Sequence, residues 1–329
     1  MAYETGTATD YLDLLDKLVT FMVANGWVSN RYETTGDYEF LAKGTGLAGT
    51  DNIYVGITTY SDEDLDYYNW RLQGALGYDA SKTFDLQPGA IPAPTIGRTP
   101  VIHLWNSNIP YWFIVNSRRA IVVAKVSTVY QIMYIGYILP YLPPSMMPYP
   151  LAIVGTSVGA CAGMTTYTGE RWSQATPSHS LGVLDPVCDL LGATSDIVAQ
   201  PNGNFRFWFQ EWGAIANKYI YTYDGGGTAR TVDSRQLWPL SLNNVDLINR
   251  LRPRPNDSSY SLLPIIVTHR LNSPNVFGEL EGIYQCSGFN NASENVIQIP
   301  DGVSGYNDYL VIQNVFRTGQ GNYCAVRLT

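Results

Sequence analysis

The sequence has little charge: Asp, Glu, Lys and Arg together make up 15% of its 329 residues. Globular proteins usually contain about 25% of these residues. The balance is acidic, with 28 Asp and Glu against 20 Lys and Arg, and the densest basic segment is the short Arg250–Arg254. Because affinity for nucleic acid depends on clustered Lys and Arg, this balance argues against a general nucleic-acid binder.

Residues that bind metals or form disulfides are also few. The four cysteines are widely separated: Cys161, Cys188, Cys286 and Cys324. The three histidines are equally scattered: His103, His179 and His269. Neither set has a zinc-site spacing such as CxxC or HExxH. We therefore expect buried, reduced cysteines and histidines in core or interface positions, and we predict no metal site and no cofactor.

The chain lacks the marks of a secretory leader and of a membrane span. Its start, Met-Ala-Tyr-Glu-Thr-Gly, has neither a basic segment nor an apolar run, so we expect synthesis in a cytosol. Ala120–Leu142 is apolar over about the length that a bilayer requires. It contains Lys125, Ser127 and Thr128 near its middle and is rich in Val, Ile and Tyr. Two strands through a protein core explain it better than a membrane helix does.

Apolar and aromatic residues are plentiful. Hydrophobic residues make up 45% of the chain, and aromatics 13%, with 24 Tyr and 8 Trp. Tyr and Trp combine an apolar body with a polar tip, which suits half-buried and interface positions. Low charge together with many amphipathic aromatics favours a protein that covers its surface with neighbouring proteins. A Tyr-rich β-sheet protein without such partners is the alternative.

One amphipathic helix is predicted over Asp10–Asn25. Its apolar residues recur at helical spacing: Tyr11, Leu14, Leu15, Leu18, Val19 and Met22. Thr7 or Thr9 is the expected cap, and Gly26 stands where a left-handed stop belongs. Asp13 and Lys17 are one turn apart, as in a helical ion pair. The apolar face needs a partner, which is either its own sheet or another subunit.

After Gly26 the pattern becomes typical of strands, rich in Tyr, Val, Ile and Thr and broken by Gly, Asn, Asp and Pro. The clearest predicted strands are Asn52–Thr59, Pro110–Asn116, Ala120–Tyr130, Phe205–Gln210, Lys218–Tyr223 and Thr228–Asp233. Hairpin turns are predicted at Asn116–Arg119, Pro201–Asn204 and Asp224–Gly227. Such short spacing leaves no room for crossover helices. The predicted fold is therefore mainly β, with sandwich-like antiparallel hairpins, one N-terminal helix and a minor α+β character.

Two proline-rich segments punctuate the chain. Gln87–Pro100 is typical of an extended linker, and there we divide residues 1–90, a helix with a small β domain, from 91–329, a larger β-rich domain. In Pro140–Pro150, Met and Tyr stand among prolines. This pattern predicts either a loop that packs over the core or a docking surface for another protein. This loop and the apolar helix face are the predicted contact surfaces.

Two short motifs suggest ligand sites. Gly44-Thr-Gly46-Leu-Ala-Gly49 matches GxGxxG, but strand-like residues follow it where a dinucleotide site needs a helix N-terminus. A β turn is the better interpretation. Asp62, Asp64 and Asp66 alternate as in a calcium loop, but Tyr67 stands where that loop needs Gly. This excludes an EF-hand and leaves a solvated acidic loop or a weak surface cation site.

Gly155-Thr-Ser157-Val-Gly159 matches the GxSxG of serine hydrolases, with Leu151–Val154 as a preceding strand. Acids that could complete a Ser–Asp–His order before His269 are Asp185, Asp189, Asp224, Asp233 and Asp246. However, the nucleophile elbow leads into a helix, and Ala160–Arg171 has no amphipathic period. We therefore predict no catalytic residue, and keep a serine esterase or depolymerase using Ser157 as the second alternative.

Segments at both ends resemble virion structural proteins of tailed bacteriophages. The segments that carry the resemblance are Asn25–Trp27, Gly44–Gly56, Tyr68–Trp70, Gly77–Asp79, Val276–Tyr284, Asn291–Val296, Tyr309–Arg317 and Ala325–Thr329. Together with Ile109–Tyr130 they bring the likeness to about two thirds of the chain. The resemblance implies a non-catalytic assembly role in the tail or baseplate of a virion, with other virion proteins or copies of itself as partners. It transfers no functional residue.

The first alternative is a glycan- or receptor-binding virion module. Trp208 and Trp212 are the residues that could stack on sugar rings.

Overall fold

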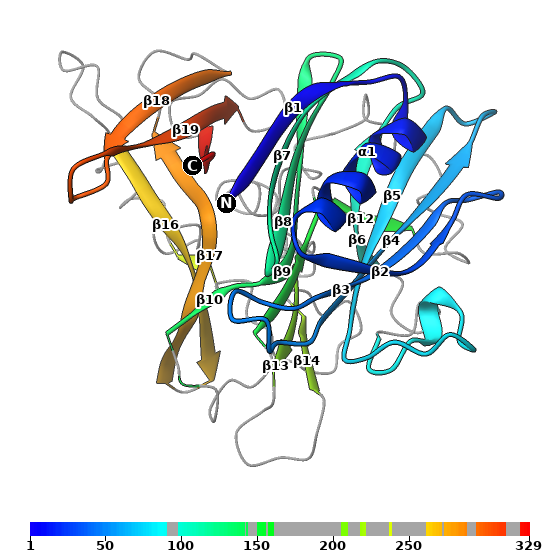
Figure 1. Ribbon diagram of the computed structural model, residues 1–329, viewed down its shortest axis with the longest axis horizontal. Coiled ribbons are helices and arrows are strands. Elements are labelled where there is room, and N and C mark those ends of the chain that lie inside the picture. Colours follow the sequence, from blue (N-terminus) through cyan, green and yellow to red (C-terminus); the bar gives the residue numbers. More distant parts are fainter. Residues whose placement is uncertain are drawn as a thin grey trace, which may run out of the picture.

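The described residues of the chain form three antiparallel β-sheets and one α-helix (Figure 1). This computed structural model describes residues 1–90, 98–141, 143, 150–155, 157–160, 205–209, 218–221, 237–238, 261–271, 273–287, 294–313 and 323–329. The predicted fold class, mainly antiparallel β with a single N-terminal helix, is confirmed.

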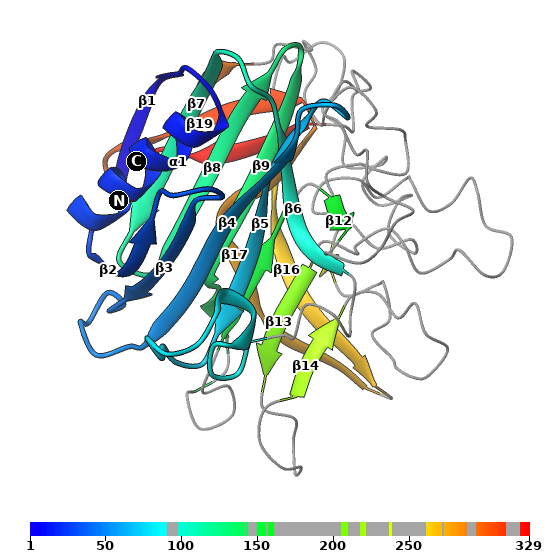
Figure 2. The same ribbon diagram turned by 90° about the vertical axis from the view of Figure 1, so that its right-hand side faces the viewer.

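The first sheet, sheet A, has seven strands and includes the N-terminal strand. Its order is β1 (Ala2–Ala8), β7 (Ile109–Asn116), β8 (Arg119–Val126), β9 (Val129–Tyr137), β11 (Leu151–Val154), β13 (Phe205–Phe209) and β14 (Lys218–Tyr221). Figure 2 shows β13 and β14 at the end of this sheet away from β1.

The second sheet, sheet B, has six strands. Its order is β12 (Ser157–Ala160), β6 (Arg98–Leu104), β5 (Tyr67–Ala75), β4 (Ile53–Asp62), β3 (Glu39–Gly44) and β2 (Trp27–Glu33). A short 3-10 helix, η1 (Phe84–Leu86), follows β5, and Phe84 is buried.

The third sheet, sheet C, is built from the C-terminal part of the chain. Its order is β15 (Leu237–Trp238), β16 (Ser261–Leu271), β17 (Ser273–Ser287), β20 (Tyr323–Arg327), β19 (Tyr306–Gln313) and β18 (Asn295–Pro300). The short β10 (Leu139–Pro140) pairs with β17.

Sheet A is the middle layer of the molecule. Sheet B and the helix lie on one side of it and sheet C on the other (Figure 1). All of β9 and nearly all of β8 are therefore buried, on both faces. Strands covered on both faces become continuous apolar runs, which explains the apolar segment Ala120–Leu142. Among the described helices, none has the length and apolar character needed to cross a bilayer.

The prediction of two strands through a core is confirmed for this segment, but the single strand predicted over Ala120–Tyr130 is wrong. The chain turns at Ser127 and Thr128, so Tyr130 belongs to β9 and pairs with Lys125 of β8. Ser127 has a positive φ of 56°. Two-residue hairpin loops favour positive φ because their twist then matches that of the strands, so the turn is made without a glycine.

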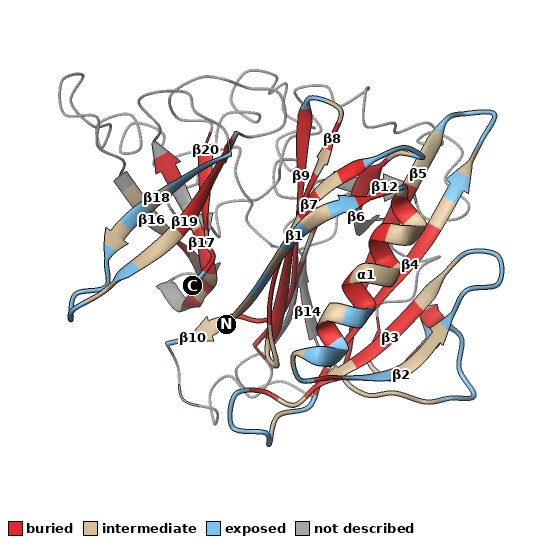
Figure 3. Cartoon of the chain, turned by 45° about the horizontal axis from the view of Figure 1, so that its top comes forward, coloured by how far each residue is buried: buried red, intermediate tan, exposed pale blue. Residues whose placement is uncertain are grey.

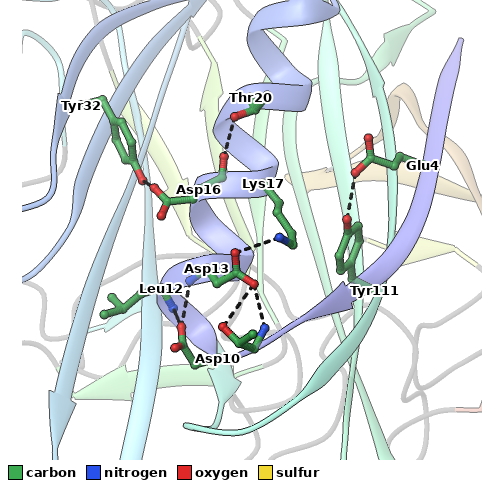
Figure 4. Close-up of polar contacts among 10 residues, drawn as sticks. Glu4, Asp10, Leu12, Asp13, Asp16, Lys17, Thr20, Tyr32 and Tyr111 are labelled. Atoms are coloured by element: carbon green, nitrogen blue, oxygen red, sulfur yellow. Dashed lines mark hydrogen bonds and ion pairs between the residues drawn. The ribbon is translucent and has the colours of Figure 1, made fainter.

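The helix α1 spans Tyr11–Ala24, close to its predicted range, but its cap differs from the prediction. Asp10 Oδ1, rather than Thr7 or Thr9, accepts the backbone N–H groups of Leu12 and Asp13, at 2.8 Å each (Figure 4). An ionised carboxylate also suits the positive end of the helix dipole. Thr9 instead donates its backbone N–H to Asp13.

Other predicted features of the helix are confirmed. Asp13 and Lys17 form an ion pair at 2.9 Å, and Gly26 has a φ of +94°. A Cβ at Gly26 would lie 2.6 Å from Ser117 Cβ, so the residue is also needed for the close approach of the β7–β8 hairpin. The apolar face packs on β1 and β7 of sheet A and on β2 of sheet B (Figure 3).

The expectation that the apolar helix face is a contact surface for another protein is therefore wrong. Leu14, Leu15, Leu18 and Met22 are fully buried in the chain's own core. A hydrogen bond adds to this packing: the buried Trp70 indole of sheet B donates its N–H to the Tyr11 carbonyl of the helix at 3.0 Å. The face has its partner within the fold.

Most predicted strands are found with slightly different ends. The hairpin at Asn116–Arg119 is confirmed, and Asn116 Oδ1 accepts the backbone N–H groups of Arg118 and Arg119 at 3.0 Å. β13 and β14 match two further predicted strands and pair with each other. The predicted turns Pro201–Asn204 and Asp224–Gly227 and the strand Thr228–Asp233 lie outside the described residues.

The division into residues 1–90 and 91–329 stays a prediction. In the structure β5 and β6, on either side of it, are neighbours in sheet B, and β1 pairs with β7 in sheet A. Separate folding of the two pieces is the measurement that decides it.

Candidate assembly interface

The hairpin β18–β19 presents an exposed strand edge at the end of sheet C, as far as the structure describes it. β18 is the last described strand of sheet C and pairs with β19 from Asn295 opposite Val311 to Pro300 opposite Tyr306. Its residues alternate between exposed and half-buried (Figure 3). A strand in this position presents unpaired backbone groups to any chain that approaches it.

The hydrogen-bond pattern fixes which backbone groups of β18 point outward. The Asp308 carbonyl accepts the Leu328 N–H at 2.8 Å, so the backbone of Asp308 faces β20. Its opposite residue Gln298 is therefore in a non-hydrogen-bonded pair, whereas Ile297 bonds to β19. The N–H and C=O groups of Val296 and Gln298 consequently point away from the sheet.

The tip of the hairpin is a well-ordered turn that exposes apolar side chains. Asp301 Oδ1 accepts the backbone N–H groups of Val303, Ser304 and Gly305 at 2.8 to 3.0 Å. These bonds, that of Gly305 first, lower the pKa of Asp301. Val303 is 91% exposed and Tyr306 66% exposed. The turn and the start of β19 therefore hold two large apolar side chains mostly in solvent.

The hairpin is anchored to the body of the protein through apolar clusters on both faces of sheet C. On one face Leu310, Ile312 and Val326 join the main core with sheet A. On the other face a smaller cluster is formed by Cys286, Tyr309, Val311, Tyr323 and Ala325, with Leu262, Tyr284, Ile297 and Ile299 half-buried against it. The base of the hairpin is therefore packed on both faces, and β18 forms its exposed edge.

Two ionic contacts also join sheet C to sheet A. The fully covered Arg119 of β8 donates Nε to Glu281 Oε2 of β17 at 3.2 Å, and one of its terminal nitrogens, Nη1, has no hydrogen-bond partner. Glu294, just before β18, accepts hydrogen bonds from Lys125 and Tyr130. Burial alone would raise the pKa of Glu294, but these bonds outweigh it and lower the pKa.

Two other edge strands, β1 and β2, are built differently. β2 has a bulge between Ser29 and Arg31, and Arg31 pairs with Glu39 at 2.6 Å. β1 has Glu4 at its centre, and this carboxylate accepts a hydrogen bond from Tyr111 at 2.9 Å (Figure 4). Bulges and charges protect an edge against added strands. β18 has neither a bulge nor a charged residue.

The second predicted contact surface, Pro140–Pro150, is described only at its ends and at Pro143. Pro140 lies in β10, opposite Gly278 of β17. Tyr141 is 50% exposed, and its hydroxyl donates to Glu279 at 2.8 Å. Residues 142 and 144–149 lie outside the described part, so the prediction for this loop is not decided.

The motif residues are dispersed over the fold. Ser157 begins β12, where it pairs with Val101 in an extended ladder, unlike the tight turn of a nucleophile elbow. His269 lies in β16, opposite Asn275. His179 and the candidate acids lie outside the described residues: Asp185, Asp189, Asp224, Asp233 and Asp246.

The two ligand motifs form connections between strands. Gly44 ends β3, Gly46 and Gly49 both have a φ of +72°, and β4 begins at Ile53, which confirms the turn. Asp62 accepts the Leu65 N–H within the β4–β5 hairpin. In the described ranges no three His, Cys, Asp or Glu residues are grouped as metal ligands.

The remaining predicted residues are placed as follows. Cys286 and Cys324 are buried, unbridged thiols, as predicted, and burial raises the pKa of Cys286 to about 12. His103 is buried in β6. Trp208 lies in β13, opposite Leu151 and Tyr219. Cys161, Cys188 and Trp212 lie outside the described residues.

Sequence reasoning missed β18 as a surface, although its signal was present. Asn-Val-Ile-Gln-Ile-Pro alternates with period two, and Gly302 and Gly305 mark the turn after it. What the pattern does not show is that β18 ends its sheet.

Comparison with protein-family models finds no family that matches the chain, and comparison with curated proteins gives no match either.

Proposed function

We propose that this protein is a non-catalytic structural subunit of a tailed-bacteriophage virion, located in the tail or baseplate. It is made in the host cytoplasm and acts through contacts with other virion proteins or with copies of itself. One observation carries the assembly role: the uncharged, unbulged edge of β18 beside the exposed apolar tip residues Val303 and Tyr306.

The physical support is the contrast between this edge and what monomeric β proteins usually have. A soluble protein that does not pair through its sheets protects its edges with charge, proline or bulges. β18 has Pro300 at its end, and its remaining residues, Asn295–Ile299, are uncharged and paired without a register shift. Retaining such an edge is expected when another strand covers it in the working assembly.

The virion assignment is supported by the resemblance of the terminal segments to phage tail and baseplate proteins. One of these segments, Asn291–Val296, runs into β18, and another, Tyr309–Arg317, contains most of β19. The resemblance and the exposed edge therefore fall on the same hairpin.

Mass spectrometry of gradient-purified particles, followed by gold labelling of the chain in electron micrographs, tests the proposal. We expect the chain in intact particles, with the label at the tail or baseplate. Its absence from particles, with recovery only in the soluble lysate, would refute the virion role. Particles made with Gln298→Pro in place of the natural chain should incorporate less of it than particles made with Gln298→Ala, which keeps the outward N–H.

A further inference from the structure

We infer that β18 pairs with β18 of a second copy of this chain, antiparallel, across a two-fold axis at Ile297. This inference rests on the proposed assembly role, because it names the partner of the same edge. It starts from the backbone groups of Val296 and Gln298, which point away from β19.

One register uses all of these groups. When Ile297 lies opposite Ile297 of the second copy, Val296 lies opposite the second Gln298, and Gln298 opposite the second Val296. Each of these two pairs joins outward-facing residues, so each can exchange both N–H···O bonds. Pro300 falls at the end of the ladder, where its missing N–H leaves no gap. The strand is thus complementary to itself, which a two-fold interface requires.

The charges permit this pairing. Asn295–Pro300 contains no charged residue, so no like charges meet between the paired strands. The flanking carboxylates, Glu294 and Asp301, are already engaged, the first by Lys125 and Tyr130 and the second by backbone N–H groups. Neither needs to be desolvated alone when a second strand approaches.

Pairing also continues the apolar cluster of sheet C across the axis. Ile297 and Ile299 are half-buried against Tyr309 and Val311, and the second copy would bring the same two isoleucines beside them. On the opposite face Val296, now 52% exposed, would be covered by Gln298 of the second copy. Area removed from water on both faces favours association. A six-residue edge is nevertheless small, so we expect a weak dimer that high local concentration in an assembly strengthens.

Disulfide trapping tests the register. In the proposed pair the two residues 297 form a non-hydrogen-bonded pair with Cα atoms about 4.5 Å apart, within disulfide range. We expect Ile297→Cys to form covalent dimers roughly tenfold or more faster than Val303→Cys, because pairing raises the effective concentration of the thiols. Position 303 is more exposed but far from the axis, so random collision predicts the reverse order. The unchanged chain gives the background from its own four cysteines.

Sedimentation velocity over a concentration series tests the pairing without an introduced thiol. We expect reversible dimers, weakened about tenfold or more by Gln298→Pro, which removes the outward N–H but none that faces β19. Gln298→Ala is the matched control: it loses the 3.0 Å side-chain bond to Asp308 but keeps the N–H. It should dimerise like the unchanged chain.

A chain that stays monomeric at all concentrations, with Ile297→Cys no faster than Val303→Cys, would overturn the self-pairing and point to a strand of another protein on β18. Equal weakening by both Gln298 variants would overturn the backbone role. These results are separate from those on the proposed function. A monomer found in particles refutes only the self-pairing, and a dimer absent from particles refutes only the virion role.

Discussion

The hairpins β8–β9 and β18–β19 are both antiparallel pairs with short connections, yet they have opposite environments. β9 is buried along its whole length, whereas no residue of β18 is fully buried. Sheet A has a layer on each side, and β18 has no neighbour beyond it among the described strands. Position in the layers, rather than strand type, therefore decides which hairpin supplies stability and which supplies a surface for contacts.

The two hairpins also differ in how they use charge. Arg119 at the start of β8 is covered completely and bonds to Glu281, while the charges near β18 lie beside the strand, at Glu294 and Asp301. Charge in the central sheet ties layers together, and its absence from β18 leaves that edge able to pair.

The largest expected difference comes from matched truncations. Ile135→Ala in β9, at a fully buried position, should lower the free energy of unfolding by about 2–5 kcal/mol because it leaves a cavity. Ile299→Ala in β18, at a half-buried position, should cost about 1 kcal/mol or less. Urea unfolding of both variants measures the difference. Equal losses would show that the hairpin is as integral to the core as the central sheet.

A second comparison uses two glycines with positive φ. Gly136 in β9 has a φ of +126°, and a Cβ there would lie 2.4 Å from the Arg118 carbonyl oxygen. Gly136→Ala should therefore cost about 2–4 kcal/mol through strain and overpacking. Gly302 in the hairpin tip has a φ of +82° with nothing within 4 Å, so Gly302→Ala should cost about 1–2 kcal/mol. Thermal unfolding of the two variants measures both losses of stability. A larger loss for Gly302→Ala would contradict the close packing around Gly136 in β9.

A smaller effect is expected where the sheets are joined by charge. Arg119→Met keeps most of the packing but removes the bond to Glu281, whose side chain is 29% exposed, so the loss should be about 1–3 kcal/mol. Adding Glu281→Gln should recover part of it, because no carboxylate is then left without its partner. A double-mutant cycle in urea measures the coupling; purely additive losses would mean that the two side chains do not interact.

The smallest effect is a pH dependence at the base of the β18–β19 hairpin. The pKa of Glu294 is lowered in the folded protein, so its stabilisation is present above the unfolded value of about 4.3 and is lost as pH falls through the folded pKa. The stability difference between the natural chain and Glu294→Gln should therefore shrink as pH falls below the unfolded value and through the lower folded pKa. Unfolding curves at several pH values measure it, with Gln298→Ala as the control. A difference that stays constant would contradict the contact with Lys125 and Tyr130.

Much of the fold could be predicted from local patterns. The spacing from Tyr11 to Met22 predicted α1, and Asn116–Arg119 predicted the β7–β8 hairpin, because helical period and turn chemistry act over a few residues. The turn at Ser127 was missed, since Ser and Thr in an apolar run resemble strand residues and no glycine marks the positive φ. The cap was assigned to Thr7 or Thr9 because several capping residues precede the helix, and Asp10 alone stands next to its first turn.

The candidate interface could not be predicted in the same way. Val296 and Gln298 are ordinary strand residues, and their importance depends on β18 being last in sheet C, which pairing with β19 and β20 decides. The helix face shows the opposite case. Its apolar residues led to the prediction of a contact with another protein, but sheets A and B of the same chain cover them.

The sequence by itself determined α1, most of the predicted strand segments, the low charge and the absence of charge from Asn295–Pro300, because these follow from residue type and period. Tertiary structure alone decided that β8 and β9 are covered on both faces while the backbone of Val296 and Gln298 points outward. The physical reason is that burial and hydrogen-bond satisfaction depend on neighbours far apart in the chain, and local pattern does not specify which strand has none.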